Sequence, residues 1–192
     1  MTAIPNADER ENDRFGYSCY AIVLPAQDEI KAICDQIEHA AGMTRAKIPA
    51  HVTVKGTFYT IDSLEEVKRC IQNITDPTAP FTVPLADAQP VWWGEKGGAL
   101  TIPVTPPLQV LHDQLVAEIT PLGQAAYQDD PYHPHMTFVQ DVTPEGLAIA
   151  QKLVAEADFG PHLRADSIDL MARVGRAHGG KWTRLIRFPL LG

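Results

Sequence analysis

The chain has 192 residues, enough to bury a substantial core in one domain or in two small lobes. Hydrophobic residues make up 45% and charged residues 21%, and no apolar run reaches the roughly 18 residues that a membrane span needs. The net charge of −8 argues against a protein that binds long duplex nucleic acid, because neutralising many phosphates requires a basic surface.

The predicted elements begin after a flexible N-terminal segment, residues 1–14. This segment is polar and acidic and lacks the basic and apolar regions of a signal peptide, so we expect a cytoplasmic protein with no membrane partner. A single domain is predicted over residues 15–192. In it "YSCYAIVLP" predicts a buried strand ending at Pro25, and residues 26–42 have the apolar spacing of a helix that ends at Gly42.

The next run, "HVTVKGTFY", predicts a second strand. Ser63 then caps a predicted helix, with Glu66 three residues later as in a capping box. Residues 80–106 contain short β-like runs around the turn-forming "GEKGG". In this segment the neighbouring Trp92 and Trp93 predict one tryptophan in the core and one that is exposed.

The second half of the chain shows a similar order of elements. A helix is predicted around residues 108–119, and "HMTFVQDV" predicts a strand. Thr143 caps the following helix, which has Pro144 at its first position. Two final strands, "LRADSIDLMARV" and "WTRLIRFPLL", flank the loop "RVGRAHGGKW". We therefore expect the chain to divide near residue 100 into two similar halves. The pattern predicts an α+β protein of two β-sheet lobes with outer helices.

Two of the predicted strands carry the same short motif, His-x-Thr. In "IPAHVTVKGTF" it is His51 and Thr53, and in "PYHPHMTFV" it is His135 and Thr137. Residues two apart on a strand share a face, so each histidine projects beside its threonine while the alternate residues form an apolar face. Each strand thus pairs a group that titrates near neutral pH with a hydroxyl donor.

Two such strands facing each other would surround a small anion with two imidazoles and two hydroxyls. One neutral histidine can accept a proton from an attacking oxygen while a protonated one donates to a leaving oxygen. The hydroxyls can donate to phosphoryl oxygens on which charge accumulates. A single His-x-Thr arises often by chance, so the argument depends on the two copies, each in a corresponding place of a two-part chain.

The segments "IPAHVTVKGTF" and "HPHMTFV" resemble the paired motifs of the two-histidine phosphoesterases, in the branch named for 2′-5′ RNA ligase activity. The resemblance implies a bilobal fold with a pseudo-two-fold axis, a central groove, and no required metal or cofactor. It also implies activity on 2′,3′-cyclic phosphates or 2′-5′ linkages, with catalytic roles for His51, Thr53, His135 and Thr137. Which histidine is the base stays open, and the reverse reaction would join RNA ends without ATP.

Five further residues are candidates for contacts with the substrate: Lys55, Tyr132, Arg176, Lys181 and Trp182. Lys55 continues the face of the first motif, Tyr132 precedes the second and could stack on a base, and the other three lie in the loop "GRAHGGKW". Each also has a structural explanation, as a solvated charge or a packing residue. The expected partner is a small nucleotide or an RNA terminus with a cyclic phosphate, bound by a monomer.

Two other functions remain open on the sequence. One is a nucleotide- or RNA-binding module of the same fold without turnover. The other is a metal-dependent hydrolase that uses His133 and His135 with Asp129 or Asp130 as carboxylate ligands. Against the metal site, Pro134 interrupts the strand between the two histidines.

Overall fold

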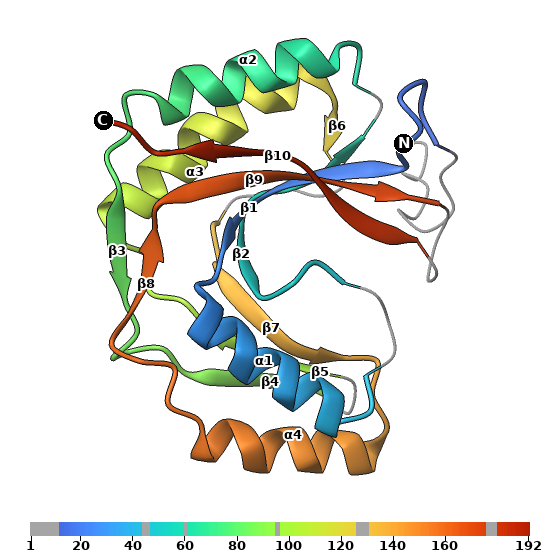
Figure 1. Ribbon diagram of the computed structural model, residues 1–192, viewed down its shortest axis with the longest axis vertical. Helices are drawn as coiled ribbons and strands as arrows, with labels where there is room; N and C mark the ends of the chain where they lie inside the picture. Colours follow the sequence, from blue (N-terminus) through green and yellow to red (C-terminus); the bar gives the residue numbers. More distant parts are fainter. Residues whose placement is uncertain (1–11, 44–46, 60, 95–96, 126–130, 176–179) are drawn as a thin grey trace.

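The computed structural model describes residues 12–43, 47–59, 61–94, 97–125, 131–175 and 180–192, and its elements form two lobes (Figure 1). In chain order they are β1 (Cys19–Pro25), α1 (Asp28–Ala40), β2 (His51–Tyr59), α2 (Leu64–Thr75), β3 (Phe81–Pro84), β4 (Pro90–Trp93), β5 (Gly97–Thr101), α3 (Pro106–Ile119), the 3₁₀ turn η2 (Thr120–Leu122), β6 (Gln124–Ala125), β7 (His135–Gln140), α4 (Pro144–Glu156), β8 (His162–Ala165), β9 (Ser167–Val174) and β10 (Lys181–Pro189).

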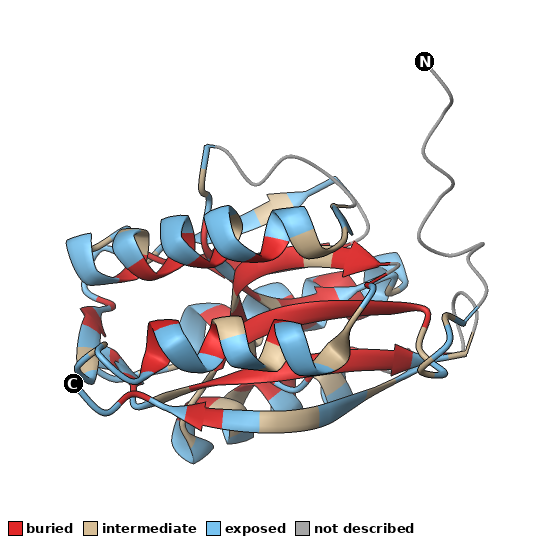
Figure 2. Ribbon diagram, turned by 90° about the horizontal axis from the view of Figure 1, so that it is seen from above, coloured by how far each residue is buried: buried red, intermediate tan, exposed pale blue. Residues whose placement is uncertain are grey.

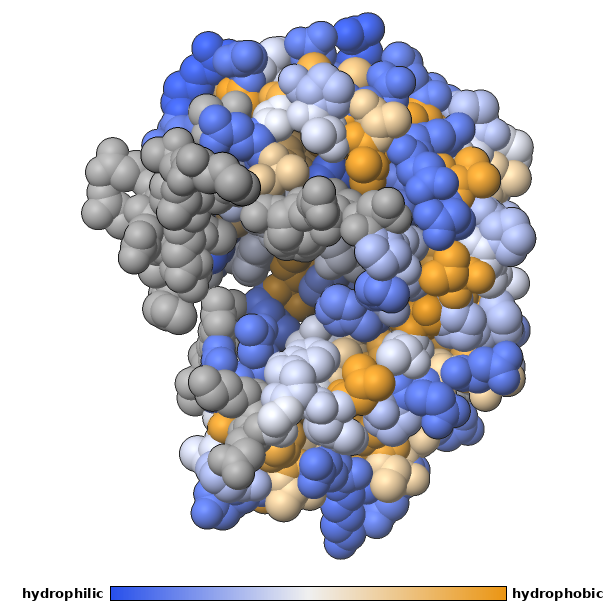
Figure 3. Space-filling view, turned by 180° about the vertical axis from the view of Figure 1, so that it is seen from behind, coloured by the Kyte–Doolittle hydropathy of each residue, from blue (hydrophilic) through white to orange (hydrophobic). Residues whose placement is uncertain are grey.

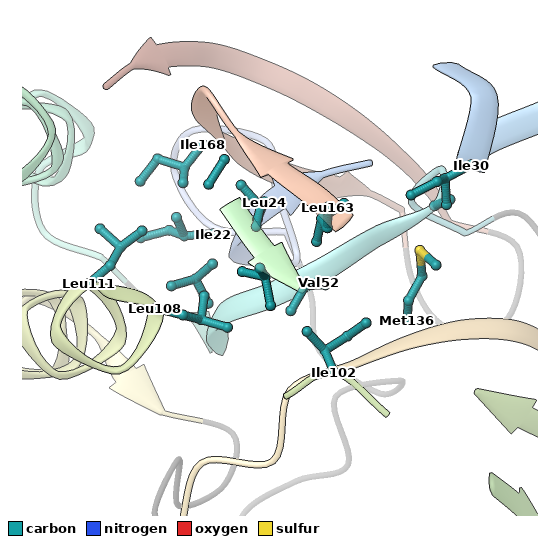
Figure 4. Packing of buried hydrophobic residues seen from close by; sticks show 14 of the residues in the cluster. Ile22, Leu24, Ile30, Val52, Ile102, Leu108, Leu111, Met136, Leu163 and Ile168 are labelled. Carbon is teal, nitrogen blue, oxygen red and sulfur yellow. The ribbon is translucent and has the colours of Figure 1, made fainter. Parts of the chain in front are cut away.

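The first lobe is an antiparallel five-stranded sheet in the order β10-β9-β1-β2-β6. Helices α2 and α3 cover one face of this sheet (Figure 1). In the core between them, Leu108 and Leu111 of α3 point toward Ile22 of β1 (Figure 4). The core continues into the second lobe through residues such as Met136 and Ile102, so the two lobes share one interior.

The second lobe is a three-stranded antiparallel sheet, β4-β5-β7, against which α1 and α4 pack (Figure 1). A separate pair, β3 and β8, runs along one side of the molecule between the lobes. In both lobes the strands hold most of the buried residues and the helices turn an exposed side outward (Figure 2). Among the described residues, no helix combines the length and apolarity that crossing a bilayer would require.

The predicted α+β class with two lobes of antiparallel sheet and outer helices is confirmed, but the predicted division near residue 100 is wrong. Each lobe takes strands from both halves: the first sheet contains β1 and β2 together with β9 and β10, and the second contains β4 and β5 together with β7. The reason is that the chain leaves β1 as α1, which packs in the other lobe, before it returns as β2. The predicted strand "LRADSIDLMARV" is likewise divided, because β8 and β9 belong to different sheets.

The helices that follow the two His-x-Thr strands begin as the sequence predicts. The Ser63 hydroxyl accepts a hydrogen bond from the backbone N–H of Glu66 at 3.1 Å, and the Thr143 hydroxyl accepts one from Gly146 at 3.1 Å. Each cap satisfies a donor of the first helical turn.

Of the predicted flexible N-terminal segment, residues 1–11 lie outside the described part. Its last residues are held in place, since the Asp13 carboxylate accepts from the Tyr20 hydroxyl at 2.7 Å.

Candidate active site

The two His-x-Thr strands, β2 and β7, lie against each other where the two lobes meet. Each histidine is the first residue of its strand, and the alternate residues of both strands are buried. His51, Thr53 and Thr137 are half-buried, and His135 is exposed. The structure therefore brings the four predicted residues to one region. In the space-filling view the surface is hollowed between the lobes (Figure 3).

The two imidazoles are held by matching hydrogen bonds. Nδ1 of His51 donates to the carbonyl of Pro49 at 2.8 Å, and Nδ1 of His135 donates to the carbonyl of His133 at 2.9 Å. In both cases the acceptor lies two residues upstream. A carbonyl oxygen only accepts, so each Nδ1 carries the hydrogen, and Nε2 is the atom through which each ring can gain or lose a proton.

The surroundings of His51 favour its neutral form. Burial lowers the pKa of His51 to about 4, and the positive charges of Lys47 and His135 act in the same direction. The carbonyl of Pro49 opposes these effects by stabilising the protonated ring. His51 is therefore neutral at pH 7, with the Nε2 lone pair available.

Two hydrogen bonds tie the motif strands together reciprocally. Lys47, just upstream of the first motif, donates from Nζ to the carbonyl of Thr137 at 2.8 Å and pairs with Glu38 at 2.5 Å. Tyr132, just upstream of the second motif, donates from its hydroxyl to the carbonyl of Thr53 at 2.9 Å. Each motif is thus fixed by the chain that leads into the other one, which sets the separation of the two histidine–threonine pairs.

The ring of Tyr132 stacks on a buried histidine that sequence analysis did not single out. His112 of α3 lies parallel to Tyr132, with ring centroids 3.8 Å apart and an interplanar angle of 8°. His112 Nδ1 also donates to the carbonyl of Val54 at 2.7 Å. One face of Tyr132 is therefore occupied, and its predicted contact with a base is limited to the other face. A histidine inside a predicted helix gives no sequence signal of this role.

The Tyr132→Phe variant is expected to lower the free energy of unfolding by about 1 kcal/mol, because it deletes the bond to Thr53 and keeps the stack on His112. Urea denaturation measures the loss. The matched control is Tyr17→Phe, since the hydroxyl of Tyr17 has no hydrogen-bond partner among the described residues. Equal stabilities for the two variants would contradict the proposed tie between the strands.

Lys55 does not share the face of His51 and Thr53, contrary to the sequence prediction. The pairing of β1 with β2 shifts register at this point, so that Thr53 lies opposite Val23 but Lys55 lies opposite Ile22, a residue of the main core. The Lys55 side chain is fully buried, with Nζ 5.8 Å from the centroid of a phenylalanine ring. The irregularity interrupts the two-residue alternation on which the prediction depended.

The remaining predicted contact residues belong to the loop before β10 and to its start. Lys181 is exposed and pairs with Val174, and Trp182 is half-buried. Trp182 packs on a small apolar cluster that lies apart from the main core and consists of Ala21, Val23, Ile48 and Met171. Arg176 lies outside the described residues.

A cavity of about 500 Å³ adjoins His51 and extends over β9 and β10. Its lining includes Val23, Met171, Arg184 and Arg187. The carboxylate of Asp169 accepts two hydrogen bonds from Arg187, at 2.7 and 2.8 Å, and lies 3.7 Å from Arg184. Two guanidinium groups thus share one carboxylate at this side of the site, and over the whole lining four acidic side chains balance four basic ones.

The metal-dependent alternative requires a carboxylate ligand that lies outside the described residues, so it stays an alternative. In the part of the chain that the structure describes, no group of three or more histidine, cysteine, aspartate or glutamate residues could hold a metal ion. The carbonyl of His133 is used to orient His135, and the His133 side chain is exposed. Asp129 and Asp130 lie outside the described residues.

Comparison with known proteins gives one family and several similar structures. Residues 25–177 match the family model described as the 2′-5′ RNA ligase superfamily. Among solved structures, LigT from E. coli complexed with 3′-AMP is 19% identical, with a TM-score of 0.59 over 89% of this chain and 97% of that one. The protein TT0787 of Thermus thermophilus is 15% identical, with a TM-score of 0.66 over 91% and 98%. At these identities the two structures show a shared fold. No curated protein sequence gives a significant match.

Proposed function

The chain belongs to the 2′-5′ RNA ligase superfamily of two-histidine phosphoesterases, and from this premise we propose that it hydrolyses 2′,3′-cyclic phosphates of nucleotides or RNA ends without a metal ion. The observation that carries the proposal is the matching anchorage of His51 and His135, which leaves one Nε2 atom on each strand for proton transfer. The activity class follows from the family, and the choice of a cyclic phosphate is the proposed part.

In the proposed reaction His51 is the base and His135 the acid. Nε2 of His51 takes a proton from water as the water oxygen bonds to phosphorus. The bond from phosphorus to one ribose oxygen breaks, and that oxygen receives the proton of His135 Nε2. The product is a ribose phosphomonoester. Thr53 and Thr137 donate hydrogen bonds to the non-bridging oxygens, on which charge builds up in the transition state.

The choice of His51 as base and His135 as acid depends on the lowered pKa of His51. A general base must be neutral at the working pH, and the surroundings of His51 lower its pKa to about 4. His135 lies in a more exposed position, where a protonated ring is hydrated at low cost. Ligation would use the same groups in the same roles, because a ribose hydroxyl would replace water as the nucleophile that opens the cyclic phosphate, and it needs no ATP.

Small nucleotides are the ligands found in a protein of similar fold. LigT from E. coli has been crystallised with 3′-AMP, with ATP and with NADP+. The net charge of −8 supports the same choice for this chain, because a protein without a broad basic surface suits a short substrate better than a long duplex.

The pH dependence of turnover is expected to show the lowered pKa of His51. Because the base must be unprotonated, kcat/KM should fall as the pH drops through about 4, well below the 6.5 of an ordinary histidine. A pH–rate profile from pH 3 to 7, with protein stability checked at each pH, measures this limb. A fall centred near pH 6.5 would contradict the assignment of His51 as the base.

The proposed substrate is tested with a panel of candidate phosphodiesters. The four 2′,3′-cyclic mononucleotides and a 2′-5′-linked dinucleotide are each incubated with the protein, and phosphorus NMR identifies the products. We expect cyclic mononucleotides to open to a single monoester isomer. If only the dinucleotide is cleaved, the family assignment holds and the cyclic-phosphate proposal is wrong. If no compound reacts but some bind, the chain is a binding module.

A further inference from the structure

A second cavity, of about 380 Å³, opens beside His135 and shares no lining residue with the cavity at His51. It is lined by Val91, Trp93, Thr101, Ile102, Val104, Tyr132, His133, Pro134 and His135. Three of these, Val91, Trp93 and Val104, are 38%, 40% and 47% exposed, and they are among the seven exposed large hydrophobic residues of the described chain. Exposed apolar side chains that gather at one hollow mark a binding surface.

Trp93 is held at this cavity because a glycine on the paired strand leaves room for its ring. In the hairpin of β4 and β5, Trp93 pairs with Gly97 and Trp92 with Gly98. A Cβ atom at Gly97 would lie 2.6 Å from Nε1 of Trp93, so the indole occupies the volume that a side chain would need. In the same manner, a Cβ atom at Gly98 would overlap the ring of Trp92. Each ring therefore lies across the neighbouring strand in a fixed position.

The two tryptophans point in different directions. Trp92 packs against the main core, with its ring 6.2 Å from that of Phe138. Trp93 lies edge-on to His135, with ring centroids 6.3 Å apart and an interplanar angle of 77°. The expected exposed tryptophan is Trp93, whereas Trp92 is half-buried against the core and not part of it. The exposed indole is a rigid aromatic surface directly beside one of the two proton-transferring rings.

We propose that Trp93, flanked by Val91 and Val104, forms the nucleobase subsite of the active site. The inference rests on the proposed function, because it concerns the substrate of that same site. A rigid, partly exposed indole suits a planar aromatic ligand, since every base has a face that stacks on it. A base placed there puts its ribose beside His135. The departing ribose oxygen is then next to the proposed acid, and the attacking water is on the side of His51.

The subsite also predicts which bases are accepted. Reading a base edge needs polar groups, and the Thr101 hydroxyl is already occupied because it donates to the carbonyl of Gln89 and accepts from the Gln89 N–H, both at 3.0 Å. The exposed His133 is the remaining polar side chain of the lining other than His135 and Tyr132. Stacking area should therefore dominate, so that purines bind several-fold better than pyrimidines with little difference between adenine and guanine.

The test compares a substrate that carries a nucleobase with a substrate that has none. For the Trp93→Ala variant, KM for 2′,3′-cyclic AMP should rise about tenfold, as expected for the loss of one base–aromatic stack. Its kcat should stay within about twofold, and KM for glycerol 1,2-cyclic phosphate, which has no base, should change far less. Trp93→Phe should restore most of the affinity. The control is Val110→Ala, an exposed apolar residue on α3 that does not line this cavity.

Two outcomes would overturn the subsite. One is an unchanged KM for cyclic AMP in Trp93→Ala, and the other is an equal rise for both substrates, which would make the effect independent of the base. A binding measurement distinguishes failure of the proposed function from failure of the subsite. If the unmodified protein turns over neither substrate, isothermal titration calorimetry with 3′-AMP decides. Binding that Trp93→Ala weakens supports the subsite. Binding that this variant leaves unchanged, or no binding by the unmodified protein, contradicts it.

Discussion

The His51→Ala variant is expected to hydrolyse 2′,3′-cyclic AMP about 10³-fold more slowly than the unmodified protein, within the 10²–10⁴-fold range of a positioned general base. The loss should be in kcat, because the base acts on water and contributes little to binding the nucleotide. His51 is half-buried and its ring bonds only to backbone in the described contacts, so the fold should survive the change. Initial rates and circular dichroism together measure the effect.

A matched control distinguishes catalysis from a general effect of losing an imidazole. His162→Ala removes an exposed histidine of β8 that lines neither cavity described above. This variant should keep its rate within about twofold. If His51→Ala also keeps its rate, the site does not use His51 as a base. If the unmodified protein and both variants bind 3′-AMP but none of them hydrolyses 2′,3′-cyclic AMP, the binding module is the better description.

The His135→Ala variant is expected to show a loss that depends on the leaving group. With 2′,3′-cyclic AMP the departing ribose oxygen needs a proton, so the rate should fall by about 10³-fold. A 4-nitrophenyl ester of a deoxynucleoside 3′-phosphate has no 2′-hydroxyl and releases nitrophenolate, which leaves as a stable anion. With this substrate the loss should be about tenfold or less, because little general acid help is needed.

The same ester separates the two histidines. His51→Ala should remain strongly impaired with it, since water must still be activated. If instead His51→Ala is the variant rescued by the nitrophenyl ester and His135→Ala is not, the roles of base and acid are exchanged. Equal losses for both variants with both substrates would contradict a division of acid and base between them.

Much of the fold could be predicted from local sequence patterns. The strand "HVTVKGTFY" agrees with β2 in full, and the caps at Ser63 and Thr143 mark where α2 and α4 begin. These features depend on neighbouring residues alone, as alternation and capping do. The position of the two histidines at the starts of strands follows from the same local information.

The features that could not be predicted depend on contacts between distant segments. The register shift that buries Lys55 arises from the pairing of β2 with β1, and one inserted residue is enough to change the face of every residue beyond it. The interleaving of the lobes is a matter of sheet order, which a pattern of elements along the chain does not give. The partner of Tyr132, His112, lies on a helix in between and has no marker in the sequence.

The central claim is that two histidines, and no metal ion, carry out phosphodiester hydrolysis at the junction of β2 and β7. The most direct test measures turnover of 2′,3′-cyclic AMP by the unmodified protein after exhaustive treatment with EDTA, beside the His51→Ala and His135→Ala variants. We predict full activity of the unmodified protein in EDTA and loss of about 10³-fold in each variant. Activity that EDTA abolishes and zinc or manganese restores would contradict the claim.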